Sequence, residues 1–94
     1  MDQEITEEIV VVNTLGLHAR PAAALVQTTL QFASDVTINM NGQQVNAKSI
    51  MGLLTLAAGF GSRLTVTCRG PDAREAMAAV KGLFADGFGE EIGE

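Results

Sequence analysis

The chain has 94 residues, of which 11 are acidic and 6 basic, and its net charge is −5 at pH 7. This length suits one small domain with a modest hydrophobic core. The acidic balance argues against nucleic-acid binding, which needs a basic footprint. No apolar run approaches the length that crosses a membrane.

The single cysteine, Cys68, excludes an internal disulfide framework and fits a reducing cytosol, so we expect a cytoplasmic protein. With one cysteine and one histidine, no metal-ligand cluster arises, and we expect neither a metal nor a cofactor.

We expect a single domain over residues 1–94 in which residues 1–7 form a flexible, solvated tail. The β-branched run at residues 8–13 predicts a strand that is buried on both faces or central in a sheet. A loop follows, and residues 22–33 predict an amphipathic helix. Its apolar positions recur every three or four residues: Ala22, Leu25, Val26, Thr29 and Phe32.

The middle of the chain predicts a hairpin and a short helix. Val36, Ile38 and Met40 alternate with polar residues, as in a half-buried strand. Asn41-Gly42 is a strong hairpin signal, because both residues tolerate a positive φ. After the return strand, Ser49 is a candidate N-cap for a short apolar helix.

The last third predicts a strand and a helix. Residues 64–69 alternate between apolar and polar side chains, and Gly70-Pro71 forms a turn. Asp72 with Glu75 resembles a capping box at the start of the helix. We expect the acidic residues after this helix to be solvated. The element order βαββαβα predicts an α+β domain with an antiparallel or mixed sheet covered by helices on one face.

The only histidine, His18, lies where the first strand ends and the first helix begins. If it caps a helix that starts at Ala19, the N–H groups of Ala19 and Arg20 are free, whereas Pro21 has no N–H to offer. Free amides at the positive end of a helix dipole form an anion site. Gly16 allows the preceding loop to fold tightly.

An imidazole that titrates near neutral pH can act as a nucleophile, and the guanidinium of Arg20 suits a phosphate. These residues predict a phosphoryl group carried on His18, with the protein acting as a receiver rather than as a catalyst. The alternative is that a lone histidine at a helix start is only a polar loop residue.

The segment Gly16-Leu17-His18-Ala19-Arg20-Pro21-Ala22 resembles the active-site signature of the HPr family, the phosphocarriers of the phosphoenolpyruvate-dependent phosphotransferase system. A second segment, Lys48-Ser49-Ile50-Met51-Gly52-Leu53, resembles the regulatory-serine segment of that family. The resemblance extends over residues 8–90. It implies an open-faced, two-layer β-sandwich, in which three helices cover a four-stranded antiparallel sheet.

The resemblance also implies a function. His18 would accept a phosphoryl group on Nδ1 from phosphorylated enzyme I and pass it to an enzyme IIA domain. Arg20 would orient the phosphate, and the backbone amides of Ala19 and Arg20 would help to hold it. The protein would be a monomeric, stoichiometric carrier and not an enzyme.

Ser49 has two interpretations. An N-cap serine is common and needs no regulation to explain it. The resemblance instead implies that an HPr kinase/phosphorylase phosphorylates Ser49 beside a partner-docking surface. The docking surface implied by the resemblance comprises Ala23, Ile50, Met51 and Leu54. A phosphate would add about two negative charges at the edge of this surface and repel an acidic partner such as enzyme I.

The chain has features of two branches of the family. Leu15 replaces a small hydrogen-bonding residue of many sugar-branch members, and residues 13–16 resemble the nitrogen branch. The Ser49 segment resembles the kinase-regulated sugar branch. The alternative to a sugar-transport carrier is therefore a regulatory interaction module, either a nitrogen-branch phosphorelay or an effector that depends on phosphorylated Ser49.

Overall fold

The computed structural model describes residues 2–94, and its elements follow the predicted order βαββαβα. The elements are β1 (Gln3–Val10), α1 (Ala19–Thr29), β2 (Asp35–Met40), β3 (Gln43–Asn46), α2 (Ile50–Thr55), β4 (Arg63–Gly70), α3 (Ala73–Ala85) and a short 3-10 turn, η1 (Gly87–Gly89).

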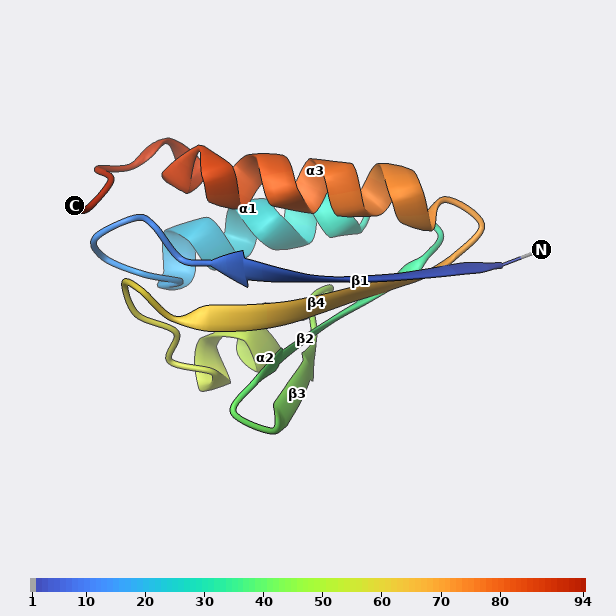
Figure 1. Cartoon of the computed structure of the whole chain (residues 1–94), viewed down its shortest axis with the longest axis horizontal. Coiled ribbons are helices and arrows are strands. Elements are labelled where there is room, and N and C mark those ends of the chain that lie inside the picture. Colours follow the sequence, from blue (N-terminus) through green and yellow to red (C-terminus); the bar gives the residue numbers. More distant parts are fainter. Residues whose placement is uncertain (1) are drawn as a thin grey trace.

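The four strands form one antiparallel sheet in the order β1-β4-β2-β3. Helix α3 packs on β1 and β4 and lies beside α1, while α2 packs on α1 and β3 (Figure 1). The helices leave the other face of the sheet open. This arrangement is the expected open-faced α+β sandwich, and the predicted fold class is confirmed.

The core lies between the sheet and the helices. In β4, Leu64, Val66 and Cys68 are fully buried, whereas Thr65 and Thr67 point to the open face. Phe84 of α3 is among the largest fully buried side chains of the same core. Burial raises the pKa of Cys68 to about 11, with smaller contributions from the charges of Asp72 and Glu7. The thiol is therefore a core group without nucleophilic character at neutral pH.

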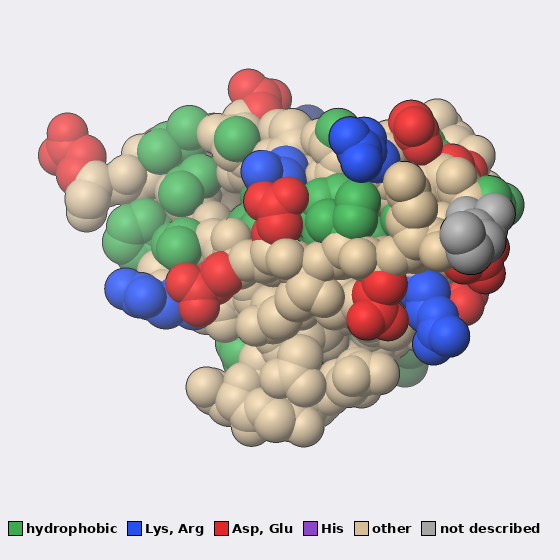
Figure 2. Space-filling model, turned by 45° about the vertical axis from the view of Figure 1, so that its right-hand side comes forward, with side chains coloured by type: hydrophobic (Ala, Val, Ile, Leu, Met, Phe, Trp, Pro, Cys, Tyr) green, Lys and Arg blue, Asp and Glu red, His purple; other side chains and the backbone are tan. Residues whose placement is uncertain are grey.

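The predicted hairpin joins β2 to β3. Asn41 and Gly42 have φ angles of 53° and 87°, as a type I′ turn requires. The hairpin residues 39–46 carry no charged side chain. The uncharged lower part of the molecule in Figure 2 contrasts with the mixed acidic and basic side chains above it.

The prediction for the N-terminal segment is wrong at both ends. Residues 3–7, expected in a tail, pair with β4, and β1 ends at Val10. The strand is also at the edge of the sheet rather than central. Its acidic residues are compatible with a strand because Glu7 pairs with Lys81 of α3 at 2.6 Å and Glu8 lies 3.7 Å from Arg63. Charges on an edge strand also oppose pairing with another chain.

Two helix termini also differ from the prediction. Helix α1 begins at Ala19 with His18 as its N-cap, as the position of His18 predicts, but it ends at Thr29 instead of residue 33. Asp72 precedes α3, but its side chain makes no capping bond, so the predicted capping box is wrong. Its carboxylate instead accepts bonds from the N–H groups of Ala33 and Ser34, both at 2.9 Å, and from the Ser34 hydroxyl at 2.6 Å. Asp72 thus fixes the turn after α1 rather than the start of α3.

Asp72→Asn is expected to lower stability at neutral pH, because an amide cannot accept from both backbone N–H groups at once. The bonds from Ser34 and Ala33 lower the pKa of Asp72 below its ordinary value. The contribution of the carboxylate is therefore present above about pH 4 and is lost as pH falls through the lowered pKa. Urea unfolding should give a lower free energy of unfolding for the variant than for wild type at pH 7, and this difference should become smaller near pH 2. Asp35→Asn, at an exposed position, makes the same charge change and should show no such difference; equal losses in both variants would contradict the assignment.

Candidate functional site

His18 is the N-cap of α1 and has extended backbone angles, φ −80° and ψ −171°. Its carbonyl accepts the first helical bond from the N–H of Ala22 at 3.0 Å. Among residues 2–94, no group accepts a hydrogen bond from the N–H of Ala19 or Arg20. The predicted pair of free amides is therefore present at the helix start, directly after the histidine.

The loop before His18 is held against a second loop, residues 56–60. Gly16 has a φ of 71°, and a Cβ at this position would lie 2.5 Å from the carbonyl oxygen of Ala58. The same oxygen accepts a bond from the N–H of Leu17 at 2.8 Å. This contact fixes the backbone that carries His18, and it explains why Gly16 is required there.

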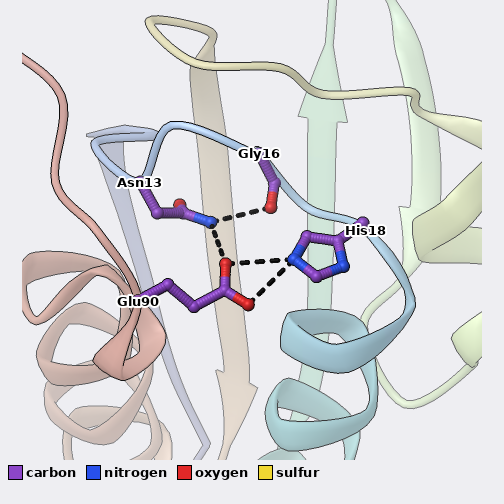
Figure 3. Close-up of polar contacts among 4 residues, drawn as sticks. All are labelled: Asn13, Gly16, His18 and Glu90. Carbon is purple, nitrogen blue, oxygen red and sulfur yellow. Dashed lines mark hydrogen bonds and ion pairs between the residues drawn. The ribbon is translucent and has the colours of Figure 1, made fainter.

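The imidazole contacts a carboxylate from the far end of the chain. His18 Nε2 lies 3.0 Å and 2.9 Å from the two carboxylate oxygens of Glu90 (Figure 3). The side chain of His18 is 38% exposed and that of Glu90 only 13%. The other ring nitrogen, Nδ1, lies on the side away from Glu90, and it has no hydrogen-bond partner within the described chain.

Asn13 connects this pair to the loop. Its fully buried amide group donates from Nδ2 to the carbonyl of Gly16 at 2.8 Å and to Glu90 Oε1 at 3.0 Å (Figure 3). Two oxygen partners fix which end of the amide is the nitrogen. Oδ1 of Asn13 is buried without a partner in the part of the chain that the structure describes. Asn13 therefore holds both the loop and the carboxylate through Nδ2, at the cost of the hydrogen bond that its Oδ1 does not make within the described residues.

Glu90 is the main residue that the sequence did not reveal. The prediction that the C-terminal acidic residues are solvated is wrong for Glu90. Its bond to His18 lowers its pKa, with further lowering from Asn13 and from the charges of His18 and Arg20, against the opposing effect of partial burial. Glu90 is therefore an ionised acceptor at neutral pH. The only local signal is the pair Gly87 and Gly89, whose positive φ angles turn the chain back toward the loop.

Arg20 lies in the first turn of α1, exposed, and makes no hydrogen bond or ion pair within residues 2–94. It is close enough for its charge to contribute to the lowered pKa of Glu90. Its guanidinium is therefore available to an incoming anion beside His18.

Ser49 is the N-cap of α2, as predicted, and its hydroxyl accepts a bond from the N–H of Gly52 at 3.1 Å. In the predicted docking surface, Met51 is 74% exposed, Ile50 and Leu54 are also exposed, and Ala23 is half-buried. Leu54 and His18 border one shallow hollow on the surface. Its lining residues are Leu15, Leu17, His18, Leu54, Ala57, Ala58 and Gly59. The structure therefore links the apolar end of α2 to the histidine; the roles of these residues remain predictions.

Across residues 2–94, no three His, Cys, Asp or Glu side chains come close enough together to hold a metal ion. None of the helices described is both long and apolar enough to cross a membrane.

Comparison with known proteins agrees with this geometry. The family model described as "PTS HPr component phosphorylation site" matches residues 5–86. The phosphocarrier protein HPr of Cupriavidus necator is 49% identical over 86 residues, which cover 92% of this chain and 97% of that protein. The crystal structure of HPr-C-His from Thermoanaerobacter tengcongensis superposes with a TM-score of 0.87 at 41% identity and covers 96% of this chain and 99% of that one. An HPr dimer from the same organism has a TM-score of 0.75 at 43% identity, with coverage of 80% and 86%.

The fold and these relatives therefore define a phosphocarrier, a protein that carries a phosphoryl group between partners and is not itself a catalyst. The chain belongs to the HPr family of the phosphotransferase system.

Proposed function

We propose that His18 accepts a phosphoryl group on Nδ1 from phosphorylated enzyme I and passes it to an enzyme IIA domain. The observation that carries this proposal is the unequal environment of the two ring nitrogens. Nε2 is engaged by Glu90, whereas Nδ1 has no partner in the described chain and belongs to the residue that caps α1. The nitrogen that is free to react thus belongs to the residue directly before the free amides of Ala19 and Arg20.

The transfer needs no proton to leave the ring. The Nδ1 lone pair attacks phosphorus, and the bond from phosphorus to the donor breaks with its electron pair returning to the donor. The amides of Ala19 and Arg20 and the guanidinium of Arg20 stabilise the phosphate oxygens. Transfer to enzyme IIA is the reverse process with a different partner. The site provides binding and orientation without a general acid and base pair of its own.

Docking residues on α1 and α2 give the partners a place to bind. Ile50, Met51 and Leu54 form an exposed apolar surface that borders the hollow beside His18, and Ala23 lies on the adjoining α1. An apolar surface of this kind supports transient protein contact. Neither partner needs to enter the core, because His18 is already at the surface.

Ser49 is the proposed regulatory position, as a substrate of an HPr kinase/phosphorylase. Its hydroxyl is half-buried and accepts a bond from Gly52 at the start of α2, so a phosphate there would lie at the positive end of the helix and add charge beside the docking surface. The alternative function is a regulatory interaction module without a role in sugar transport, either a nitrogen-branch phosphorelay or an effector that depends on phosphorylated Ser49. Leu15, exposed on the rim of the hollow, favours the nitrogen branch.

The direct test is intact mass after incubation with enzyme I, Mg²⁺ and phosphoenolpyruvate. Wild type should gain one acid-labile phosphate, and His18→Ala should gain none. No mass change in wild type with a competent enzyme I would refute the carrier function. Addition of ATP and an HPr kinase should give an acid-stable phosphate that is absent in Ser49→Ala; its persistence in that variant would remove Ser49 from the proposal.

A further inference from the structure

We propose that Glu90 is a positioning residue for the phosphoryl acceptor: its carboxylate holds the proton on Nε2 of His18, blocks that nitrogen and so directs phosphorylation to Nδ1. This inference rests on the proposed function and assigns a role to a residue outside the signature around His18.

The backbone around Glu90 is anchored on both sides. Its own N–H donates to the carbonyl of Gly87 at 3.0 Å. The next residues form a short bridge with the loop before His18: the N–H of Thr14 donates to the carbonyl of Glu91 at 2.9 Å, and the N–H of Gly93 donates to that of Val12 at 2.8 Å. The carboxylate is thus carried by a segment that is hydrogen-bonded to the same loop as the histidine.

The carboxylate is aimed at one ring nitrogen. Both of its oxygens lie within 3.0 Å of Nε2, and Asn13 also donates to one of them (Figure 3). A carboxylate can only accept, so Nε2 must carry the hydrogen. In the neutral imidazole the lone pair is then on Nδ1.

The same contact assists the charge balance of the reaction. When Nδ1 bonds to phosphorus and Nε2 keeps its proton, the ring becomes positively charged. Glu90 is already ionised beside that proton and offsets the charge without moving. When the phosphoryl group leaves, the electron pair of the P–N bond returns to Nδ1 and the starting tautomer is restored. An acidic side chain that orients a histidine in this way acts as the aspartate does in a serine-protease triad.

The test uses the small molecule phosphoramidate as phosphoryl donor, so it requires no partner protein. Phosphoramidate loses ammonia as its phosphoryl group is transferred to an imidazole nitrogen. The position of the phosphate is then read from the coupling between ³¹P and ring ¹⁵N. In wild type we expect the Nδ1 product to predominate. In Glu90→Ala the ratio of Nε2 to Nδ1 product should rise by about tenfold or more, the scale of one lost charge-assisted hydrogen bond.

The matched control is Glu91→Ala, which removes the same charge one residue away on an exposed side chain and should leave the product unchanged. Glu90→Gln retains an oxygen that can accept from Nε2 and should lie between wild type and Glu90→Ala. A second measurement is the ¹⁵N-coupled Nε2–H proton signal, which should be slow to exchange in wild type and in Glu91→Ala but fast in Glu90→Ala.

An unchanged product ratio in a folded Glu90→Ala variant would overturn the inference, as would a predominance of the Nε2 product in wild type. If Nδ1 selectivity depends on Glu90 but enzyme I does not phosphorylate the protein, the positioning role stands and the proposed partner fails. The two results are therefore distinguishable.

Discussion

Gly16→Ala is expected to destabilise the protein strongly and to disturb the site at the same time. A methyl group would meet the Ala58 carbonyl oxygen at 2.5 Å and Gly59 Cα at 2.8 Å, both of them backbone atoms that cannot rotate away. The φ of 71° adds the strain of a left-handed alanine. Together these effects correspond to about 2–5 kcal/mol. Thermal unfolding should show a decrease of more than about 10 °C in Tm.

Gly42→Ala separates the two causes. Gly42 has a similar φ of 87°, but a Cβ there would meet nothing within 4 Å. Gly42→Ala should therefore lower the free energy of unfolding by about 1–2 kcal/mol, which is the cost of the backbone strain alone. Phosphorylation of His18 should fall in Gly16→Ala, because the loop that positions the ring must shift, and should be retained in Gly42→Ala. Equal losses of stability in the two variants would show that the contact with residues 56–60 is unimportant.

Arg20→Ala is expected to slow phosphoryl transfer by about tenfold or more, the effect of losing a charge-assisted contact worth about 1.5–3 kcal/mol. The folded structure should be unaffected, since Arg20 is exposed and bonds to no residue between 2 and 94. Single-turnover transfer from phosphorylated enzyme I, followed by quenching and mass analysis, measures the rate directly.

Two further variants test whether the position and the shape of Arg20 matter. Arg74→Ala removes an exposed arginine on α3 and makes the same change in net charge. It should leave the transfer rate near that of wild type; a matching decrease would indicate general charge effects. Arg20→Lys keeps the charge but lacks the planar fork, so its rate should lie between wild type and Arg20→Ala. Full activity in Arg20→Ala would exclude Arg20 from phosphate orientation.

Features encoded by neighbouring residues could be predicted from the sequence. The alternation of Val36 and Ile38, the Asn41-Gly42 turn and the Ser49 cap depend on local backbone chemistry, and each is present. The start of α1 followed from the position of His18 before a helix. The comparisons with HPr proteins confirm the fold, which the element order alone left open between antiparallel and mixed sheets.

Features formed by distant residues could not be predicted. The acidic residues at the start of β1 predict a solvated tail. They are compatible with a strand because Lys81, 74 residues away in sequence, pairs with Glu7. Asp72 precedes a helix and indicates a cap, yet its partners are the residues after α1, 38 and 39 positions away. Glu90 is 72 residues from His18, so no local pattern indicates their contact.

The bridge between the loop and the C-terminal segment has a consequence for the motions of the protein. Within residues 2–94, two backbone hydrogen bonds make this bridge, at Thr14 and Gly93, whereas eight residue pairs join β1 to β4. Segments with few such bonds open locally at lower free energy than the central sheet. The amides of Thr14 and Gly93 should therefore exchange with deuterium faster than those of β4. Their protection factor would measure how often the imidazole is released from its carboxylate while the rest of the domain stays folded.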